Sequence, residues 1–247
     1  MKKSAFLVST IVLIFIILFV SCDKIDDAKR NVIYAEDVKP FSDSDNVDNI
    51  ATVKAFLYGS KEGIKEIASS KFDNNGFTLT LPNDIDEKYL INFPNIPDGL
   101  TISQPDAKQG NILILAFDNE GKQIGSFSYF TYQVNNNKEV NYFSSSSYAY
   151  FNKNVTIKGN YSFGDIDIKY NCSFKKGWNI GYTTIDNTKE GSRVTWLFTS
   201  KKPAKDKFIW YFEEGNILLL FDRNKYDSLS ENFDHFAPIP TFLRLCN

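Results

Sequence analysis

The chain has 247 residues, with 28 basic and 30 acidic side chains, a formal net charge of −2 and an aromatic content of 15%. This mild acidity excludes the basic face that a nucleic-acid-binding protein needs. A single histidine and three cysteines cannot supply the several His and Cys ligands of a zinc site.

The first 22 residues have the layout of a secretory signal. Lys2 and Lys3 give a positive start, Phe6 to Val20 is a nearly unbroken apolar run, and charge resumes directly after Cys22. The run is shorter than the roughly 20 residues of a transmembrane helix. We therefore expect a cleaved signal peptide over residues 1–21 rather than a retained membrane anchor.

The residues Phe19, Val20, Ser21 and Cys22 resemble a lipobox, the acylation and cleavage site of bacterial lipoproteins. Ser21 fits the cleavage rule, whereas Phe19 departs from the usual leucine, as in the relaxed lipoboxes of Bacteroidota and spirochaetes. The resemblance implies that Cys22 becomes the lipidated N-terminus. Two or three acyl chains anchor a protein stably to a membrane, so the resemblance also implies a cell-envelope location, on the surface or periplasmic face of an outer membrane.

Residues 22–47 are polar, Asp-rich and without clear periodicity, which predicts a flexible tether that leaves room for a short element around Val32 to Tyr34. The acidic run from Asp23 to Asp27 resembles the surface-export signal of Bacteroidota lipoproteins. A merely solvated tether explains the same run equally well, so both interpretations stay open.

From Asn49 onward the hydrophobic residues recur mainly with a period of two, which predicts β-strands. In Asp165 to Phe174, apolar and polar residues alternate strictly, as in a strand with one buried face. Ile112 to Phe117 and Phe208 to Phe212 are apolar throughout, as in strands buried on both faces. The only short helix candidates are Asp84 to Tyr89 and Lys225 to Asn232.

Glycine-containing turns separate the predicted strands, and a hairpin is expected at each turn. The turns are Lys61-Glu62-Gly63, Asn74-Asn75-Gly76, Asn119-Glu120-Gly121, Lys175-Lys176-Gly177, Lys189-Glu190-Gly191 and Glu214-Gly215-Asn216. The predicted fold class is therefore all-β, with one or two antiparallel β-sandwich modules of transthyretin-like or immunoglobulin-like type behind the lipidated tether.

The segments Val53 to Leu57, Ile67 to Ser69 and Asp73 to Pro82 resemble a transthyretin-like β-sandwich of the carboxypeptidase regulatory type. The resemblance implies a sandwich over residues 48–134 and transfers no catalytic residue. A second β-rich module is expected over residues 135–247. The polar stretch Asn135 to Lys138 is the candidate boundary, or else a long hairpin loop.

No catalytic or metal-binding constellation is found, and we expect neither enzymatic activity nor a cofactor. A catalytic dyad or triad needs a nucleophile beside its histidine. The sequence pattern places no such residue near His235, the only histidine. Two acidic groups, Asp43/Asp45/Asp48 and Asp84/Asp86/Glu87, lack the glycine and spaced glutamate of a calcium-binding EF-hand.

Once Cys22 is acylated, Cys172 and Cys246 remain. An even pair in an exported protein permits a disulfide, although Cys172 lies on the apolar side of its predicted strand, where a buried free thiol is equally familiar. The run from Asp227 to Leu229 resembles an O-glycosylation site of Bacteroidota proteins, which would place a sugar on Ser228.

The segment Tyr142 to Tyr150 combines tyrosines with Ser144 to Ser147, a mixture typical of adaptable binding surfaces. An edge strand with small outward residues explains it as well. The tryptophans Trp178, Trp196 and Trp210 fit either a core or a platform for sugar rings. We expect a non-catalytic binding or adhesion module for an unknown protein or glycan; the alternative is a structural or accessory subunit of an envelope assembly or transporter.

Overall fold

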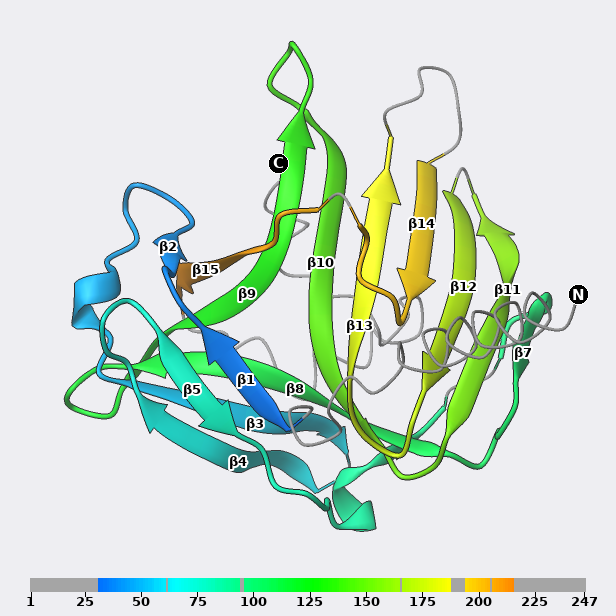
Figure 1. Ribbon diagram of the computed structural model, residues 1–247, viewed down its shortest axis with the longest axis horizontal. Coiled ribbons are helices and arrows are strands. Elements are labelled where there is room, and N and C mark those ends of the chain that lie inside the picture. Colours follow the sequence, from blue (N-terminus) through cyan, green and yellow to red (C-terminus); the bar gives the residue numbers. More distant parts are fainter. Residues whose placement is uncertain are drawn as a thin grey trace, which may run out of the picture. The chain divides into compact units, whose positions relative to one another are not determined.

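The computed structural model describes residues 31–60, 62–93, 96–164, 166–187, 194–204 and 206–215. In this part of the chain every regular element is a strand, apart from the 3-10 turns η2 (Val47–Asn49) and η3 (Glu87–Tyr89). The all-β prediction is confirmed (Figure 1). The helix expected between Asp84 and Tyr89 is reduced to η3, and Lys225 to Asn232 lie outside the described residues.

The strands are β1 (Val32–Ala35), β2 (Lys39–Pro40), β3 (Thr52–Ser60), β4 (Gly63–Lys71), β5 (Phe77–Thr80), β6 (Ile91–Asn92), β7 (Leu100–Ile102), β8 (Lys108–Phe117), β9 (Gln123–Val134), β10 (Val140–Phe151), β11 (Val155–Phe163), β12 (Ile166–Phe174), β13 (Gly177–Asp186), β14 (Val194–Thr199) and β15 (Ile209–Glu214). β1 and β5 pair with each other, and the other strands belong to one 13-stranded sheet.

The large sheet has two parts that share β8. The lower sheet is β4–β3–β8, in which β3 pairs along Asn111 to Phe117 of β8. The upright sheet runs β15–β9–β10–β13–β14–β12–β11–β7, and β8 reaches it through Gln109 to Asn111, which pair with β10 (Figure 1). β8 therefore passes from one layer into the other.

The main core lies between the upright sheet and the layer formed by the lower sheet with β1 and β5. Alternating apolar residues of β1, β3 and β5, among them Ile33, Val53 and Leu79, are fully buried there. From the upright sheet, Trp178 and Phe212 join the same cluster. Large apolar side chains thus hold the layers together, the arrangement of an open β-sandwich.

Two strand pairings are parallel, so the sheet is mixed rather than purely antiparallel. β12 pairs with β14, and β15 with β2, in parallel. The hairpin expected at Gly177 is consequently wrong: β13 leaves that turn to pair with β10 and β14 instead of β12. At Gly76 the expected reversal is present as an antiparallel bridge between Asp73 and Gly76, but β5, which follows it, pairs with β1 and not with β4. The hairpins at Gly63 and Gly121 are confirmed.

The folded body begins earlier than the predicted tether allows. Val32–Ala35 forms β1, and the Ile33 side chain is fully buried in the core. Val38 is also buried, and Phe41 packs against the Phe130 ring at 5.8 Å. The short element around Val32 to Tyr34 is therefore confirmed as β1, whereas Val38 and Phe41, which were assigned to the tether, belong to the folded body.

The predicted module boundary after residue 134 falls in the hairpin that joins β9 to β10. Asn135 caps this hairpin through its backbone bonds with Lys138 and Glu139. The strands on either side pair along Tyr129 to Val134. Residues on both sides of that boundary therefore belong to the same sheet.

The upright sheet has two faces, because neighbours in register across paired strands share a face. One face, here called the tyrosine face, carries Tyr129, Tyr148 and Tyr182. The other, the phenylalanine face, carries Phe130, Phe143, Phe151, Phe174 and Phe198. The alternation predicted in β12 is confirmed: Ile168, Tyr170, Cys172 and Phe174 are buried on the phenylalanine face.

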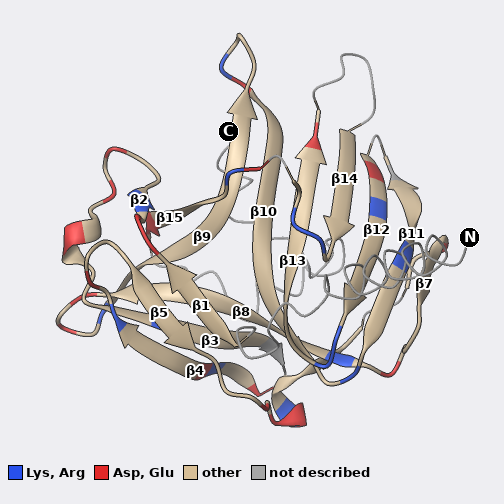
Figure 2. Cartoon of the chain, viewed as in Figure 1, with Lys and Arg blue, Asp and Glu red and all other residues tan. Residues whose placement is uncertain are grey.

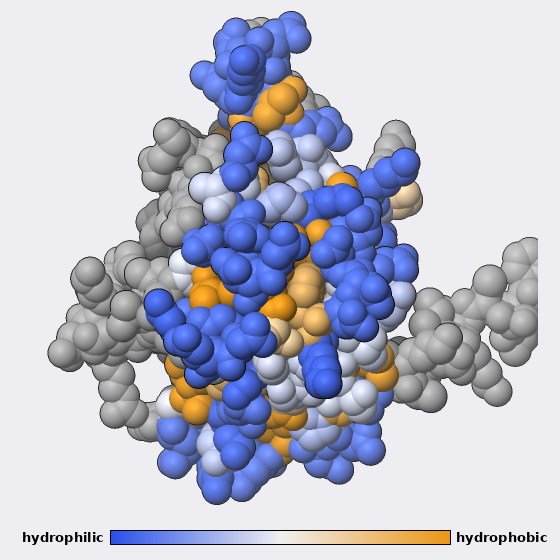
Figure 3. All heavy atoms as spheres, turned by 90° about the vertical axis from the view of Figure 1, so that its left-hand side faces the viewer, coloured by the Kyte–Doolittle hydropathy of each residue, from blue (hydrophilic) through white to orange (hydrophobic). Residues whose placement is uncertain are grey.

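The surface on the side of β2 and the β9–β10 hairpin is mainly hydrophilic. Apolar atoms reach that surface in separate small areas between charged and polar ones (Figure 3). Val134, near the tip of the hairpin, is 51% exposed. Scattered exposed apolar residues of this kind are ordinary on a protein surface.

Candidate functional site

The candidate site is built on a row of residues that crosses the upright sheet. Ser146 of β10 lies in register with Tyr129 of β9 on one side and Tyr182 of β13 on the other. Tyr148 follows on the same face of β10, two residues further on. The Ser146 hydroxyl donates to the Tyr129 backbone carbonyl at 3.4 Å, and on the neighbouring register pair the buried Ser144 and Thr184 hydroxyls form a 3.1 Å hydrogen bond.

The described residues between β14 and β15, which are residues 200–204 and 206–208 and are here called the strap, cross this face (Figure 1). The Phe208 ring lies 5.2 Å from the Tyr129 ring and 5.5 Å from the Tyr182 ring. Phe208 therefore lies between the two tyrosines that flank Ser146. Aromatic pairs at these separations and inclinations attract each other beyond their simple burial.

Polar contacts fix the strap at two further points. The Tyr142 hydroxyl donates to both carboxylate oxygens of Asp206, at 2.9 and 3.1 Å. Lys202 Nζ lies 5.3 Å from the Phe208 ring centroid and 5.8 Å from that of Tyr129, within the range of cation–π attraction. Through these contacts the strap places the Lys202 ammonium group and the Asp206 carboxylate beside the aromatic residues of this face.

The hydroxyls of Tyr148 and Tyr182 stay protonated at physiological pH. Burial, reinforced by the neighbouring Tyr182 and Tyr129, raises the pKa of Tyr148. Burial likewise raises the pKa of Tyr182. Within the described part of the chain, neither hydroxyl has a hydrogen-bond partner. These groups can exchange hydrogen bonds with a ligand, but they are poorly suited to acid–base catalysis near neutral pH.

Away from the strap, the same face becomes polar and cationic. The row continues in register from Tyr182 through Thr199 and Asn171 to Lys158. Lys169 lies on the same face of β12, two residues before Asn171. Both Lys158 and Lys169 are exposed. Basic residues on β11 and β12 are visible in Figure 2. A ligand spanning the face would meet aromatic rings at one end and amides and ammonium groups at the other.

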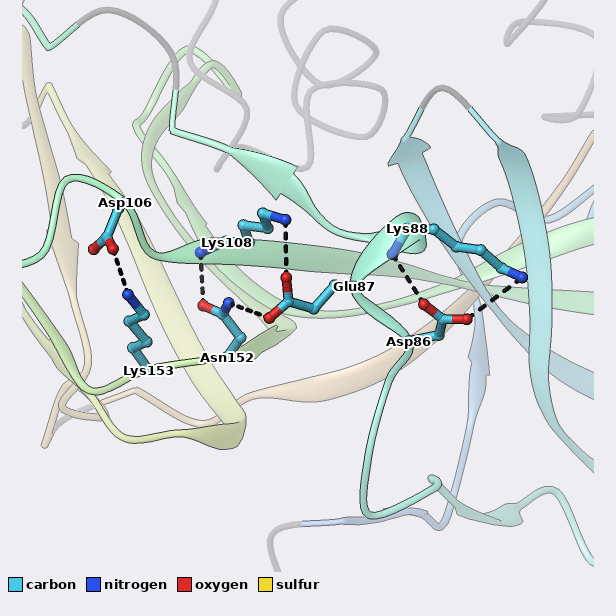
Figure 4. A network of polar contacts seen from close by, with 7 residues as sticks. All are labelled: Asp86, Glu87, Lys88, Asp106, Lys108, Asn152 and Lys153. Atoms are coloured by element: carbon cyan, nitrogen blue, oxygen red, sulfur yellow. Dashed lines mark hydrogen bonds and ion pairs between the residues drawn. The ribbon is translucent and has the colours of Figure 1, made fainter.

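A separate polar network ties η3 to the corner where β8 meets β10 (Figure 4). Glu87 accepts from Lys108 Nζ at 2.9 Å and from Asn152 at 3.3 Å, while the Asn152 side-chain oxygen accepts from the Lys108 backbone at 2.7 Å. The hydrogen bond from Lys108 is the main cause that lowers the pKa of Glu87. Lys153 pairs nearby with Asp106.

Of the acidic group Asp84/Asp86/Glu87, which was considered as a calcium site, Asp86 and Glu87 have lysine or asparagine partners instead. Asp86 accepts from the backbone and the ammonium group of Lys88, and the backbone hydrogen bond is the main cause that lowers its pKa. The other group contributes Asp45, whose carboxylate accepts from the backbones of Ser42 and Glu214. Across the residues with a described position, no three His, Cys, Asp or Glu side chains gather in a way that could hold a metal ion.

Most of the residues singled out individually in the sequence lie outside the described residues. These are Cys22, Ser228, His235 and Cys246. Cys172 is described: it is buried and free, and burial raises the pKa of its thiol to about 12. The lipidation, the glycosylation and the Cys172–Cys246 disulfide stay predictions.

The segment Tyr142 to Tyr150 is part of the site, but not as an edge strand. It forms β10, which is paired on both sides, with β13 along its length and with β9 and then β8 on the other side. The tyrosines Tyr129 and Tyr182, from other strands, complete the surface and carried no distinguishing signal in the sequence. Trp178 and Trp210 lie in the main core, where their indole N–H groups donate to Pro82 and Tyr34 carbonyls.

No protein-family model matches this chain, and comparison with curated proteins and with solved structures gives no significant match. Among the residues that can be described, no helix has the length and apolarity to cross a membrane. The functional argument therefore rests on the residues of the site and on the sequence of the N-terminus.

Proposed function

We propose that this chain is a lipid-anchored, non-catalytic binding protein of the bacterial cell envelope, and that the tyrosine face contacts its ligand. The observation that carries the proposal is the row Tyr129–Ser146–Tyr182 with the adjacent Tyr148. The Tyr148 and Tyr182 hydroxyls lie beside aromatic rings and have no hydrogen-bond partner among the described residues, whereas the Ser146 hydroxyl donates to the Tyr129 backbone carbonyl. Rings that combine an apolar face with a hydrogen-bonding tip are favoured at binding surfaces.

The anchor is the acylated Cys22. Because the folded body begins at Val32, only about ten residues connect it to the acyl chains, and a chain of that length spans at most about 35 Å. The body would therefore stay close to the membrane surface, on the outer or the periplasmic side of an outer membrane. Loss of palmitate labelling and of membrane fractionation in Cys22→Ser tests the anchor, and protease treatment of intact cells tests the side.

The ligand class that fits the face is a glycan. Sugar rings offer C–H surfaces that pack on aromatic rings, and hydroxyls that exchange hydrogen bonds with tyrosine, serine, threonine and asparagine. The exposed Lys158 and Lys169 further along the face favour a glycan that also carries acidic groups. A protein partner is the competing occupant, and it is an outcome of the same experiment.

The test is binding of the purified full chain to an array of bacterial and host glycans. The double variant Tyr148→Phe, Tyr182→Phe removes two hydroxyls and keeps both rings. At about 0.5–1.5 kcal/mol for each hydrogen bond, it should weaken binding roughly tenfold. Tyr132→Phe is the matched control, because Tyr132 lies on the opposite face and is 40% exposed. An array without any specific signal, or equal loss in the control, would contradict the proposal.

A structural or accessory subunit of an envelope assembly is the second candidate. It is favoured by β4, which pairs only with β3 in the described part of the chain and so presents an open edge nine residues long. Open edges are templates for pairing with another chain. In-cell cross-linking followed by purification separates the candidates: a stoichiometric protein partner lost in Glu66→Pro, but retained in Tyr182→Phe, would favour assembly over ligand binding.

The transthyretin-like assignment stays a proposal about the part of the body that contains β3, β4, β5 and β8. Its support is that these strands contribute side chains to one shared core. An experimental structure would test it through the strand order of that layer. A topology unlike that of transthyretin domains would leave the binding proposal standing, since that rests on the upright sheet.

A further inference from the structure

The phenylalanine face of the upright sheet is apolar and buried over most of its width. Phe130 and Phe151 are fully buried, and Phe174 and Phe198 are at most 5% exposed. The Phe151 and Phe174 rings stack at 4.5 Å. A sheet with large apolar side chains on both faces requires a covering layer on each side. On the tyrosine face, Tyr150 and Trp178 pack in the main core and Phe208 of the strap covers Tyr129 and Tyr182, while Lys158 and Lys169 stay exposed.

Described residues cover the phenylalanine face in two places. Where β10 ends, Phe93 packs against Phe151 at 6.3 Å, and Ala107 belongs to the same cluster. At the β15 and β9 end, Phe41 packs against the face. Between these places lie the cross-strand neighbours Ser145 and Thr183, which are only 2% and 4% exposed. The two apolar clusters beside them contain no other described residue from a second layer.

Buried polar atoms on this face point to the nature of the missing layer. The Ser145 hydroxyl is buried and has no hydrogen-bond partner within the described part of the chain. The same holds for both polar atoms of the Gln109 side chain, which is fully buried in register with Phe151. Buried polar groups in folded proteins are nearly always paired. A polypeptide can supply these partners, whereas a hydrocarbon surface cannot.

We propose that residues 216–247 of the same chain form this covering layer. The described chain ends at Gly215, whose backbone N–H donates to Ile124 at 2.9 Å, at the β15 edge of the upright sheet. Directly beyond it, Ile217 to Phe221 is an unbroken apolar run, and nearly half of residues 216–247 are apolar. By contrast, six of the nine residues 22–30 are charged, which makes them unsuitable for covering an apolar face.

The length of the segment is sufficient. Its residues could reach about 100 Å when fully extended. The distance from β15 to β12 is five strand spacings, or about 24 Å. The segment can thus cross the face and return, and its end can come near Cys172, the position at which the predicted bond to Cys246 would form.

Photo-cross-linking in the intact chain tests the proposal. A benzophenone amino acid replaces Tyr132, which lies on the phenylalanine face in register with Phe143, and in a matched control it replaces Tyr34 of β1. Both tyrosines are exposed, at 40% and 61%, so both substitutions should be tolerated. After illumination, mass spectrometry should find residues 216–247 of the same molecule attached at position 132 and not at position 34.

Attachment at position 132 to a second copy, to lipid or to a separate protein would overturn the proposal, and so would attachment only to other parts of the same chain. A concentration series separates a second copy from the same molecule, because only the former yields a cross-linked dimer that increases with concentration.

Thiol labelling gives an independent readout. In the chain carrying Cys22→Ser and Cys246→Ser, Cys172 is the only thiol, and it is 4% exposed on the phenylalanine face. Leu219→Asp should raise its labelling rate at least tenfold, while Ser230→Asp adds the same charge outside the apolar run and should not. Circular dichroism checks that both variants keep the sheet. An unchanged rate in folded Leu219→Asp would contradict the proposal, and if that variant unfolds, the cross-linking result decides.

Discussion

The two faces of the upright sheet are made by the same strands, and β10 shows their contrast most directly. Its alternate residues Tyr142, Ser144, Ser146, Tyr148 and Tyr150 point to the tyrosine face. The residues between them, Phe143, Ser145, Ser147, Ala149 and Phe151, point to the phenylalanine face. Both sets mix small and aromatic side chains. They differ in whether the rings carry hydroxyls, and that difference separates a surface suited to polar recognition from one suited only to packing.

The contrast indicates that the two faces contribute differently to folding stability and to ligand binding. Loss of a ring from the phenylalanine face should mainly change the free energy of unfolding, because it leaves a cavity. Loss of a hydroxyl or charge from the tyrosine face should mainly change the strap and the binding of a ligand. The predictions below probe this division in order of decreasing effect.

The largest effect is expected for Phe130→Ala on the phenylalanine face. Phe130 is fully buried and packs on Tyr211 at 4.4 Å and on Phe143 at 5.5 Å. Truncation should lower the free energy of unfolding by about 3–5 kcal/mol. Urea denaturation measures it. Tyr132→Ala, two residues away on the same face but exposed, should cost about 0.5 kcal/mol or less; similar losses in both would mean that the face is not a packed layer.

A smaller effect is expected for Trp178→Phe, at the lower end of the tyrosine face. The Trp178 indole N–H donates to the Pro82 carbonyl at 2.7 Å and joins β13 to the segment before η3. Without it that carbonyl loses its partner, at a cost of about 1–3 kcal/mol by urea denaturation. Trp210→Phe, which loses a longer bond of 3.2 Å to Tyr34, provides the comparison and should cost less. The reverse order would show that packing, not hydrogen bonding, dominates at these two rings.

The sequence predicted the strands well because local alternation determines which residues can share a face. In β12 every second residue from Ile168 to Phe174 is buried, as the period of two requires. Pairing was less predictable. The Lys175-Lys176-Gly177 turn has the chemistry of a hairpin, yet β12 pairs in parallel with β14. Turn residues specify a local reversal, whereas the choice of partner depends on packing between segments far apart in the chain.

The candidate site shows the same limit. The serine and tyrosine composition of Tyr142 to Tyr150 drew attention to β10, but Tyr129 and Tyr182 come from β9 and β13 and join Ser146 only through register. The aromatic strand predicted over Phe208 to Phe212 forms as β15, which begins one residue later, at Ile209. Phe208 itself lies in the strap, where its ring packs between those of Tyr129 and Tyr182.

Tyr142→Phe tests the strap through its pH dependence. Burial and the Asp206 carboxylate raise the pKa of Tyr142 to about 12 from its ordinary value of 10. The protonated phenol therefore stabilises the folded state below pH 10, and this contribution is lost as the pH rises toward 12. The urea midpoint should fall more steeply over that range in the unmodified chain than in Tyr142→Phe. Tyr132→Phe, on the other face, should retain the steeper fall, and identical profiles in all three proteins would show that the Tyr142–Asp206 contact does not stabilise the strap.

The smallest effect is expected for Lys202→Gln, which removes the cation over the Phe208 and Tyr129 rings. At an exposed position such contacts contribute about 0.5–1 kcal/mol. A double-mutant cycle with Phe208→Leu isolates the pair, because each single change also alters packing or solubility on its own. A coupling energy in that range would place Lys202 on the aromatic surface, where it could also meet an acidic glycan. Zero coupling, with glycan binding still reduced in Lys202→Gln, would mean that the lysine acts on the ligand directly and that the strap is held by Phe208 and Asp206 alone.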